Sequence, residues 1–199
     1  MAKPEKAQNI VNASAEGIAA SARAASKRGL PPVHLWNPPD CGDLDMRIAR
    51  DGTWFYLGTP IGRPELVRLF STILRKDGDR YVLVTPVEKV GIQVDDAPFV
   101  AVDFEVTEED GRPRLTFETN VGDHAVAGPE HPIRVERDAV TGEPRPYVHV
   151  RGGLEALIDR KSFYRMVERG ETRMHEGAEV FGVESDGAFF PLTHAGDLG

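Results

Sequence analysis

Four arginines recur at matched positions in two stretches of the chain, and their side chains are well suited to binding an anion. Arg63 and Arg68 correspond to Arg160 and Arg165, 97 residues later. A guanidinium group presents five donors in a planar fork that fits carboxylate and phosphate oxygens. Within one helix, five residues turn through about 500°, so Arg63 and Arg68 cannot share a face. Arg63 and Arg160 could converge instead from the starts of two helices, where backbone amides favour anions.

Local ion pairs are the simpler interpretation of these charges. Glu65 and Asp159 stand beside the repeated arginines and could fix the chain at the start of each helix. Lys89 follows Glu88 in the bend 85–89. There Lys89 could meet a ligand anion, or the two residues could form a surface pair worth about 0–1 kcal/mol.

Three further polar residues follow predicted strands and are candidates for orienting a ligand. Asn120 and Asp123 stand in a glycine-containing turn, where such side chains usually bond their own backbone. Arg151 ends a predicted strand and precedes Gly152-Gly153, which we interpret as a strand-to-helix turn rather than a phosphate loop because no following Lys-Ser/Thr is present.

The sequence contains no motif typical of a catalytic or metal centre. The six histidines lack the H-x-x-x-H and H-E-x-x-H spacings, and Cys41 is the one cysteine. No Gly-x-Ser-x-Gly is present. We therefore expect no metal and no cofactor, and we favour a protein that is not an enzyme.

Turn residues and apolar spacing divide the chain into elements that must position these candidates. Helices are predicted over 5–28, from Pro64 to Asp77-Gly78, and over 160–169, with an extended strap over 29–42. The remaining predictions are strands, in order 44–48, 53–57, 81–85, 90–94, 99–106, 115–119, 132–137, 146–151, 179–184 and 188–192. Trp54 and Tyr56 alternate along one strand and are predicted to be core rather than a stacking surface for a base.

An internal repeat organises these elements. The stretch from Met46 to Asp51 returns as Ile133 to Asp138, and Ile61 to Phe70 returns as Ile158 to Val167. The additional residues of the second copy fall where loops are expected. A duplicated unit predicts two similar domains, with a ligand cleft at their interface.

Composition narrows the class of protein. The chain has 199 residues, 40% of them hydrophobic and 28% charged, which is typical of a globular protein. No apolar run approaches the roughly 20 residues needed to span a bilayer, and no secretory signal is recognisable. The formal charge of -8 makes nucleic acid an unfavourable partner. With a single cysteine, a reducing cytoplasm is the expected location.

The motifs Gly58-Thr59-Pro60-Ile61-Gly62-Arg63 and Thr85-Pro86-Val87-Glu88-Lys89, followed by Asp96-Ala97-Pro98-Phe99 and Thr119-Asn120-Val121-Gly122-Asp123, resemble an uncharacterised bacterial family, domain of unknown function 1285. The resemblance covers about 30 to 192. It implies two domains of duplicated origin, of which the second is similar to a pleckstrin homology fold. It also implies a signalling role with a small molecule or nucleic acid at the domain interface. No activity comes with the resemblance.

The predicted fold is α+β, with two β-rich domains of duplicated origin at 43–125 and 126–192, each carrying one main helix. An N-terminal helix and strap (1–42) precede them and a tail (193–199) follows. The predicted function is cytoplasmic binding of a small anion or nucleotide at the inter-domain cleft. The predicted ligand-binding residues are Arg63, Lys89, Asn120, Asp123, Arg151 and Arg160. A protein-interaction adaptor without a pocket is the alternative, and a nucleic-acid binder ranks third.

Overall fold

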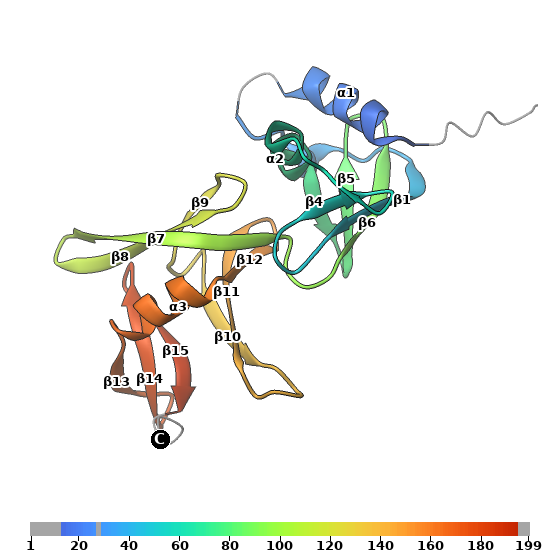
Figure 1. The fold of residues 1–199 in the computed structure, drawn as a ribbon. Coiled ribbons are helices and arrows are strands. Elements are labelled where there is room, and N and C mark those ends of the chain that lie inside the picture. The colour runs from blue at the N-terminus through green and yellow to red at the C-terminus, as the bar shows by residue number, and fades with distance from the viewer. Residues whose placement is uncertain (1–12, 27–28, 195–199) are drawn as a thin grey trace, which may run out of the picture.

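The computed structural model describes residues 13–26 and 29–194 (Figure 1). Three α-helices, one short 3-10 helix (Val33–Leu35) and fifteen strands lie in these residues. They form two β-rich halves, each with one α-helix embedded between its strands, and α1 (Ala15–Ala25) adds a further helix to the first half. The predicted helix over 5–28 is therefore described only in part, because 1–12 and 27–28 lie outside the described residues, as does most of the predicted tail.

The first half is built on one six-stranded sheet, sheet A, with strand order β3-β2-β1-β6-β5-β4. Its elements are β1 (Asp40–Ile48), β2 (Trp54–Tyr56), β3 (Thr59–Pro60), α2 (Pro64–Thr72), β4 (Leu74–Asp77), β5 (Arg80–Val84) and β6 (Lys89–Val94). Strands β1 to β3 form one antiparallel meander, and strands β4 to β6 form another. The parallel pairing of β1 with β6 joins the two meanders. Alternation along β1 buries Leu44, Met46 and Ile48 on one face.

Helices α1 and α2 cover that buried face of sheet A (Figure 1). The Ser14 hydroxyl caps α1 by accepting from the Gly17 amide at 3.1 Å. Ile18 and Ala22 of α1 are fully buried and α1 contacts α2. This helix therefore packs on its own chain. Its small residues allow close approach to α2 but contribute little apolar area.

Helix α2 begins at Pro64, as predicted, but ends at Thr72 rather than at Asp77-Gly78. Leu74 leaves the helix to pair with Leu83 in the β4–β5 hairpin, which Gly78 and Asp79 close. The apolar residues at 73 and 74 suit a helix face and a strand equally. The pairing of β4 with β5 therefore determines where the helix ends.

The second half contains two sheets, B and C. Sheet B has the order β10-β11-β12-β7-β8-β9 and sheet C the order β13-β14-β15. Their elements are β7 (Phe99–Glu109), β8 (Arg112–Thr119), β9 (His124–Val126), β10 (Ile133–Arg137), β11 (Pro144–Arg151), β12 (Leu154–Ile158), α3 (Arg160–Val167), β13 (Glu171–His175), β14 (Ala178–Ser185) and β15 (Ala188–His194). Ser185 joins the sheets, because its buried hydroxyl accepts from the Leu115 amide and donates to the Ala127 carbonyl.

The order of elements supports a duplicated origin. Strands β10 to β12, helix α3 and strands β13 to β15 repeat the meander, helix and meander of the first half, and β10 lies beside β15 as β1 lies beside β6. A cross-strand pair is repeated as well. The Arg47 guanidinium lies 4.6 Å from the Phe55 ring centre, and that of Arg134 lies 4.3 Å from the Tyr147 ring centre.

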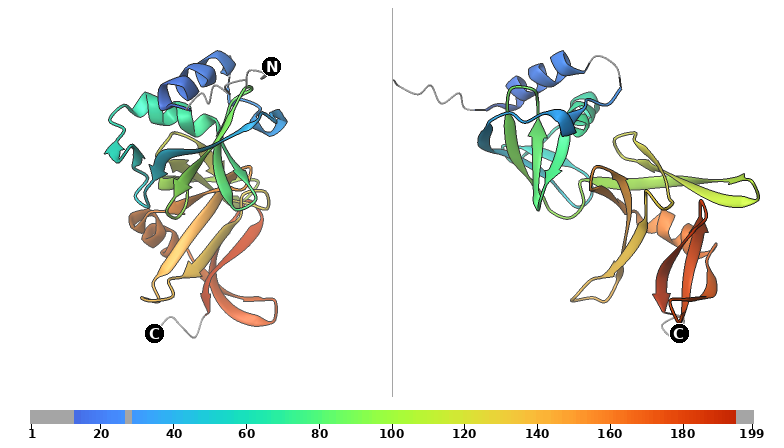
Figure 2. Two further views of the ribbon diagram at one scale, coloured as in Figure 1. Left: turned by 90° about the vertical axis from the view of Figure 1, so that its right-hand side faces the viewer. Right: turned by 180° about the vertical axis from the view of Figure 1, so that it is seen from behind.

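The hairpin β7–β8 belongs to the second half, which differs from the predicted boundary between 125 and 126. Strand β7 pairs in parallel with β12, so β7, β8 and β9 complete sheet B, and the β7–β8 hairpin extends away from sheet A (Figure 2). The division between the sheets lies between β6 and β7. The prediction failed because pairing of β7 with β12 joins residues that no local pattern connects. Gly152-Gly153 turns β11 into β12 rather than into a helix.

A buried carboxylate, Asp96, ties the two halves together at this division. Its Oδ1 accepts from the Tyr147 hydroxyl at 2.7 Å and lies 2.9 Å from the Arg145 guanidinium, while its Oδ2 lies 3.4 Å from Arg50 Nε. Only 8% of the Asp96 side chain is exposed. Burial, followed by the hydrogen bond to Asp96, raises the pKa of Tyr147 to about 12.

We expect this raised pKa to make the protein lose stability between about pH 10 and pH 12. The unfolded chain ionises Tyr147 first, so the free energy of unfolding should fall by about 1.4 kcal/mol per pH unit through that window. Below the unfolded pKa this contribution is fully present. Urea unfolding at pH 9 and pH 11 should show a smaller difference between wild type and Tyr147→Phe at the higher pH. An unchanged difference would contradict the expectation.

Candidate functional site

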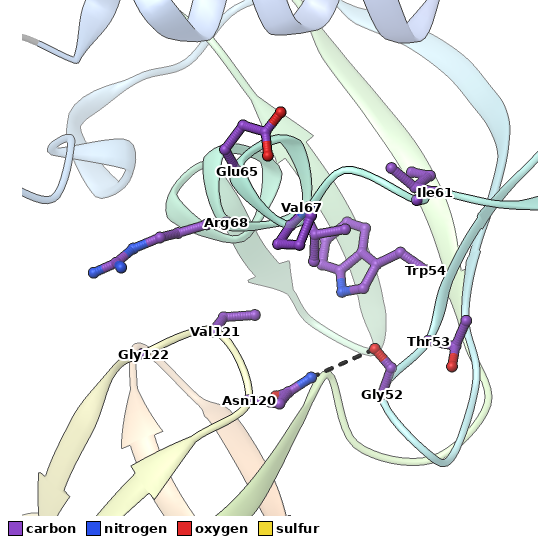
Figure 3. Close-up of a pocket in the computed structure, with 12 residues that line it drawn as sticks. Gly52, Thr53, Trp54, Ile61, Glu65, Val67, Arg68, Asn120, Val121 and Gly122 are labelled. Atoms are coloured by element: carbon purple, nitrogen blue, oxygen red, sulfur yellow. Dashed lines mark hydrogen bonds between the residues drawn. The ribbon is translucent and has the colours of Figure 1, made fainter.

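A cleft of about 810 Å³ lies where the first half meets the β8–β9 turn of the second. We call it the junction cleft. Gly52 to Trp54 and the residues around the start of α2 line one side, and residues 120–122 line the other (Figure 3). Both halves therefore contribute to one concave surface.

Trp54 lines the junction cleft and carries an unpaired hydrogen-bond donor buried just behind its wall. Its side chain is 1% exposed and its ring stacks on Phe70 with 6.2 Å between the ring centres. The indole Nε1 is buried and has no hydrogen-bond partner in the described structure. Figure 3 shows this nitrogen on the side of the ring that faces Gly52 and Asn120. A buried donor without a partner costs about 1–3 kcal/mol, so an acceptor in the cleft would relieve a cost already present.

Arg68 supplies the positive charge of the cleft. Its side chain is exposed and lies over Gly122, where an added Cβ would come within 3.4 Å of the guanidinium. Within the described part of the chain Arg68 has no ion-pair partner. The one carboxylate among the lining residues, Glu65, points away from the 120–122 turn (Figure 3). An anion would therefore meet little repulsion next to Arg68.

The start of α2 adds the positive end of a helix dipole to the same side of the cleft. Pro64 occupies the first helical position, and the side chain of the N-cap residue Arg63 makes no capping hydrogen bond. Pro64 has no N–H, and the Leu66 and Val67 amides donate to the Arg63 carbonyl, so the Glu65 amide is the first-turn donor left for a ligand in the described structure. The helix dipole favours negative charge there. Arg63 itself is exposed beside the cleft and does not line it.

Asn120 spans the junction. Its Oδ1 accepts from the Val100 amide at 3.0 Å and its Nδ2 donates to the Gly52 carbonyl at 3.4 Å. A Cβ added at Gly52, which has a φ of +87°, would lie 2.6 Å from that Nδ2. The predicted ligand-orienting role thus falls on a residue that lines the cleft and also holds its two walls together.

Asp123 and Arg151 form an ion pair behind the turn. Arg151 lies 3.1 Å from Asp123 and donates to the Ser71 carbonyl at the end of α2 at 2.8 Å. Burial lowers the pKa of Arg151, while Asp123 opposes that effect. The hydrogen bond from Arg151 to Ser71 links the halves, and neither Asp123 nor Arg151 lines the junction cleft.

The remaining predicted site residues lie elsewhere. Lys89 pairs with Asp77 at 3.1 Å, and hydrogen bonds first from Arg75 and then from Lys89 lower the pKa of Asp77. Arg160 lines a different pocket beside α3 and pairs with Glu143 at 3.4 Å, so Arg63 and Arg160 do not converge on the junction cleft. Asp159 does not pair with Arg160 but caps α3 by accepting from the Ser162 amide.

Sequence reasoning missed Trp54 and Arg68 as site residues. Trp54 was assigned to the core, and its ring is indeed buried, but the alternation of a strand does not show which edge of the ring faces a cavity. Arg68 carried a usable signal, since it belongs to the repeated set of arginines.

Comparison with known proteins places the chain in a family. Residues 31–97 match "Domain of unknown function (DUF1285), N-terminal domain", and residues 98–192 match "Protein of unknown function (DUF1285), C-terminal domain". The chain belongs to the DUF1285 family. The two DUF1285 domains meet at 97 and 98, between β6 and β7, where sheet A gives way to sheet B.

Two solved DUF1285 structures are similar to this chain. The protein from Silicibacter pomeroyi DSS-3 is 64% identical with a TM-score of 0.83, over 92% of this chain and 97% of the other. The protein from Shewanella baltica OS155 is 31% identical with a TM-score of 0.51, over 63% of this chain and 91% of the other. No curated protein matches the chain.

The described residues of this DUF1285 protein contain no group of three or more His, Cys, Asp or Glu side chains that could hold a metal ion. No helix in residues 13–26 and 29–194 is long and apolar enough to cross a membrane. The junction cleft offers hydrogen-bond donors and a cation, which suit ligand binding.

Proposed function

We propose that the protein is a ligand-binding regulatory protein that holds a small anion, such as a nucleotide or another phosphorylated or carboxylated metabolite, in the junction cleft. The observation that carries this proposal is the buried, unpaired Nε1 of Trp54, which faces a cleft that also contains the unpaired Arg68. Ile61, Val67 and Val121 line the same cleft and would contact an apolar part of the ligand.

Charge and geometry support an anion over a neutral ligand. A hydrogen bond to an ionised partner contributes about 1.5–3 kcal/mol, compared with about 1 kcal/mol for a neutral one. Arg68 and the first turn of α2 would both favour negative charge. Removal of the cleft from water on ligand binding would strengthen each of these interactions.

A regulatory role follows from the position of the cleft. A ligand that contacts Trp54 or Arg68 on one side and Asn120 on the other binds both halves, so it would stabilise the arrangement of the halves that it contacts best. A cytoplasmic signalling role belongs to the same proposal, as does a pleckstrin-homology-like fold for the second half. That fold is supported by two packed sheets with one helix.

The test is a thermal-shift screen of the purified chain against nucleotides, phosphorylated metabolites and carboxylates. A ligand at 100 times its dissociation constant should stabilise the protein by about 2.7 kcal/mol. Arg68→Ala should abolish the shift for a hit. Arg112→Ala removes a charge that is also exposed but lies at the distant β7–β8 turn, and it should leave the shift intact. A hit that is indifferent to Arg68 would place its binding elsewhere.

A protein-interaction adaptor remains the second candidate, because a specific apolar surface favours it. Leu30 is 51% exposed and Leu35 is 72% exposed, and both line a groove of about 740 Å³ between residues 30–37 and strand β4. If no compound in the thermal-shift screen stabilised the protein, that result would favour this candidate. Nucleic-acid binding ranks third, and an affinity that falls steeply with salt would be needed to support it.

A further inference from the structure

Two adjoining pockets form one groove along helix α3, which we call the α3 groove. The first pocket measures about 290 Å³ and the second about 210 Å³. They share Pro144, Phe163 and Tyr164. Tyr164 is 57% exposed, so a large aromatic ring lies at the surface between the two ends. The groove lies in the second half and shares no lining residue with the junction cleft.

One end of the α3 groove is cationic. Arg50, Arg145 and Arg160 line it. Arg145 uses one terminal nitrogen, Nη2, on Asp96, while the other, Nη1, lies 4.0 Å from Asp138, beyond hydrogen-bond distance. Arg160 meets Glu143 at 3.4 Å, and both side chains are well exposed, so the pair contributes little. Donors on two arginines therefore remain available to a ligand.

The carboxylates around this end are already engaged. Asp96 accepts from Tyr147 and pairs with Arg145, and Asp159 accepts from the Ser162 amide. Asp138 lies 4.0 Å from Arg145, and its side chain accepts from two backbone amides of its own turn. Glu143 is the carboxylate whose contact with Arg160 a bound anion would replace.

The other end of the α3 groove is apolar. Val167 from α3, Phe181 from β14 and Leu192 from β15 line it, with Arg137 and Thr193 beside them. Arg137 donates to the Gly142 carbonyl and to the Thr193 hydroxyl. A ligand that fits both ends needs a charged group and an apolar tail.

The internal repeat gives this groove the same place in the second half that the junction cleft has in the first. Ile158 and Tyr164 line the groove and correspond, at the offset of 97 residues, to Ile61 and Val67, which line the junction cleft. Each pocket lies where a three-stranded meander is followed by the helix of that half, α2 in the first and α3 in the second. Each pocket is also lined by at least one residue of the opposite half. Asn120 enters the first pocket and Arg50 enters the second.

We infer that the α3 groove binds a small amphipathic carboxylate, with its carboxylate at Arg145 and Arg160 and its unbranched alkyl tail across Tyr164 onto Val167, Phe181 and Leu192. Charge complementarity selects the acid at one end, and burial of methylene groups selects the tail at the other. This site is independent of the anion proposed for the junction cleft.

The test is calorimetric titration of the full chain with straight-chain carboxylates from butanoate to decanoate, below their micelle concentrations. Each added methylene should strengthen binding about fourfold until the apolar end is filled, after which affinity should level off. Val167→Phe should move that limit to a shorter chain and leave butanoate binding unchanged. Equal weakening of every acid by Val167→Phe, or no dependence on chain length, would overturn the inference.

Arg160→Ala tests the cationic end. Arg160 is exposed, so its removal should not affect folding, and circular dichroism checks this. The variant should bind the acid at least tenfold more weakly but the alcohol of the same chain length equally well. Arg112→Ala should leave both affinities unchanged. Binding that is lost in Arg68→Ala rather than in Arg160→Ala would place the acid in the junction cleft and refute the α3 site. Binding of apolar peptides in place of every carboxylate would likewise refute it.

Discussion

Trp54→Ala is expected to destabilise the protein by about 3–5 kcal/mol, because it removes a fully buried indole from the core of the first half. The ring stacks on Phe70, a residue of α2 that is itself fully buried. The cavity left behind would also remove one wall of the junction cleft. Chemical unfolding measures the loss directly, and a change below about 1 kcal/mol would show that the ring is not packed as described.

Trp54→Phe separates the packing role of this residue from its role as a donor. Phenylalanine keeps an aromatic ring against Phe70 but removes the unpaired Nε1, so we expect a much smaller change in stability than for Trp54→Ala. Affinity for an anion in the junction cleft should nevertheless fall about 10- to 100-fold, as for the loss of a hydrogen bond to a charged partner. Unaltered affinity in Trp54→Phe would remove the main support for the proposed function.

Asp96→Ala is expected to cost about 3 kcal/mol, since it leaves two polar groups without their shared partner. The Tyr147 hydroxyl and the Arg145 guanidinium both use Asp96, and the hydrogen bond to Asp96 is the first cause that raises the pKa of Arg145. Arg50 of the first half would lose its partner as well. Because these contacts join the halves, urea unfolding of the variant should also become less cooperative.

Asp95→Ala is the matched control for that prediction. Asp95 precedes Asp96 and pairs with Arg47 at 2.5 Å, but the side chains of both Asp95 and Arg47 are partly exposed to solvent. Exposed ion pairs contribute about 0–1 kcal/mol. Similar losses in Asp95→Ala and Asp96→Ala would mean that burial of Asp96 does not stabilise the junction.

The sequence predicted those elements whose signals are local. Asp51-Gly52, Glu109-Asp110-Gly111 and Asp186-Gly187 each close a hairpin at the predicted place. The strands that were missed lack such signals. Strand β13 (Glu171–His175) is exposed on both faces, so it has no alternation to detect. Strand β12 follows the two glycines that suggested a turn into a helix.

The candidate site was predictable from the sequence only where a residue carries a local pattern, and not where it depends on contacts between distant segments. Asn120 was named as a candidate because asparagine in a glycine-containing turn is a recognisable pattern. The proximity of its turn to Trp54 and Arg68 depends on the division of the sheets at β7, which joins residues far apart in sequence. The orientation of the Trp54 nitrogen depends on the side-chain rotamer, and no sequence pattern encodes it.

The parallel pairing of β7 with β12 also affects how the chain folds during synthesis. The first half has all its strands once β6 has emerged, whereas one edge of β7 must wait for β12, about 50 residues later. At 5–20 residues per second that edge stays open for about 3–10 s on the ribosome. Phe99 to Ala101, which are buried in the finished sheet, are exposed throughout this interval. The nascent second half is therefore the stage at which we expect the chain to depend most on chaperones and to be most prone to aggregation.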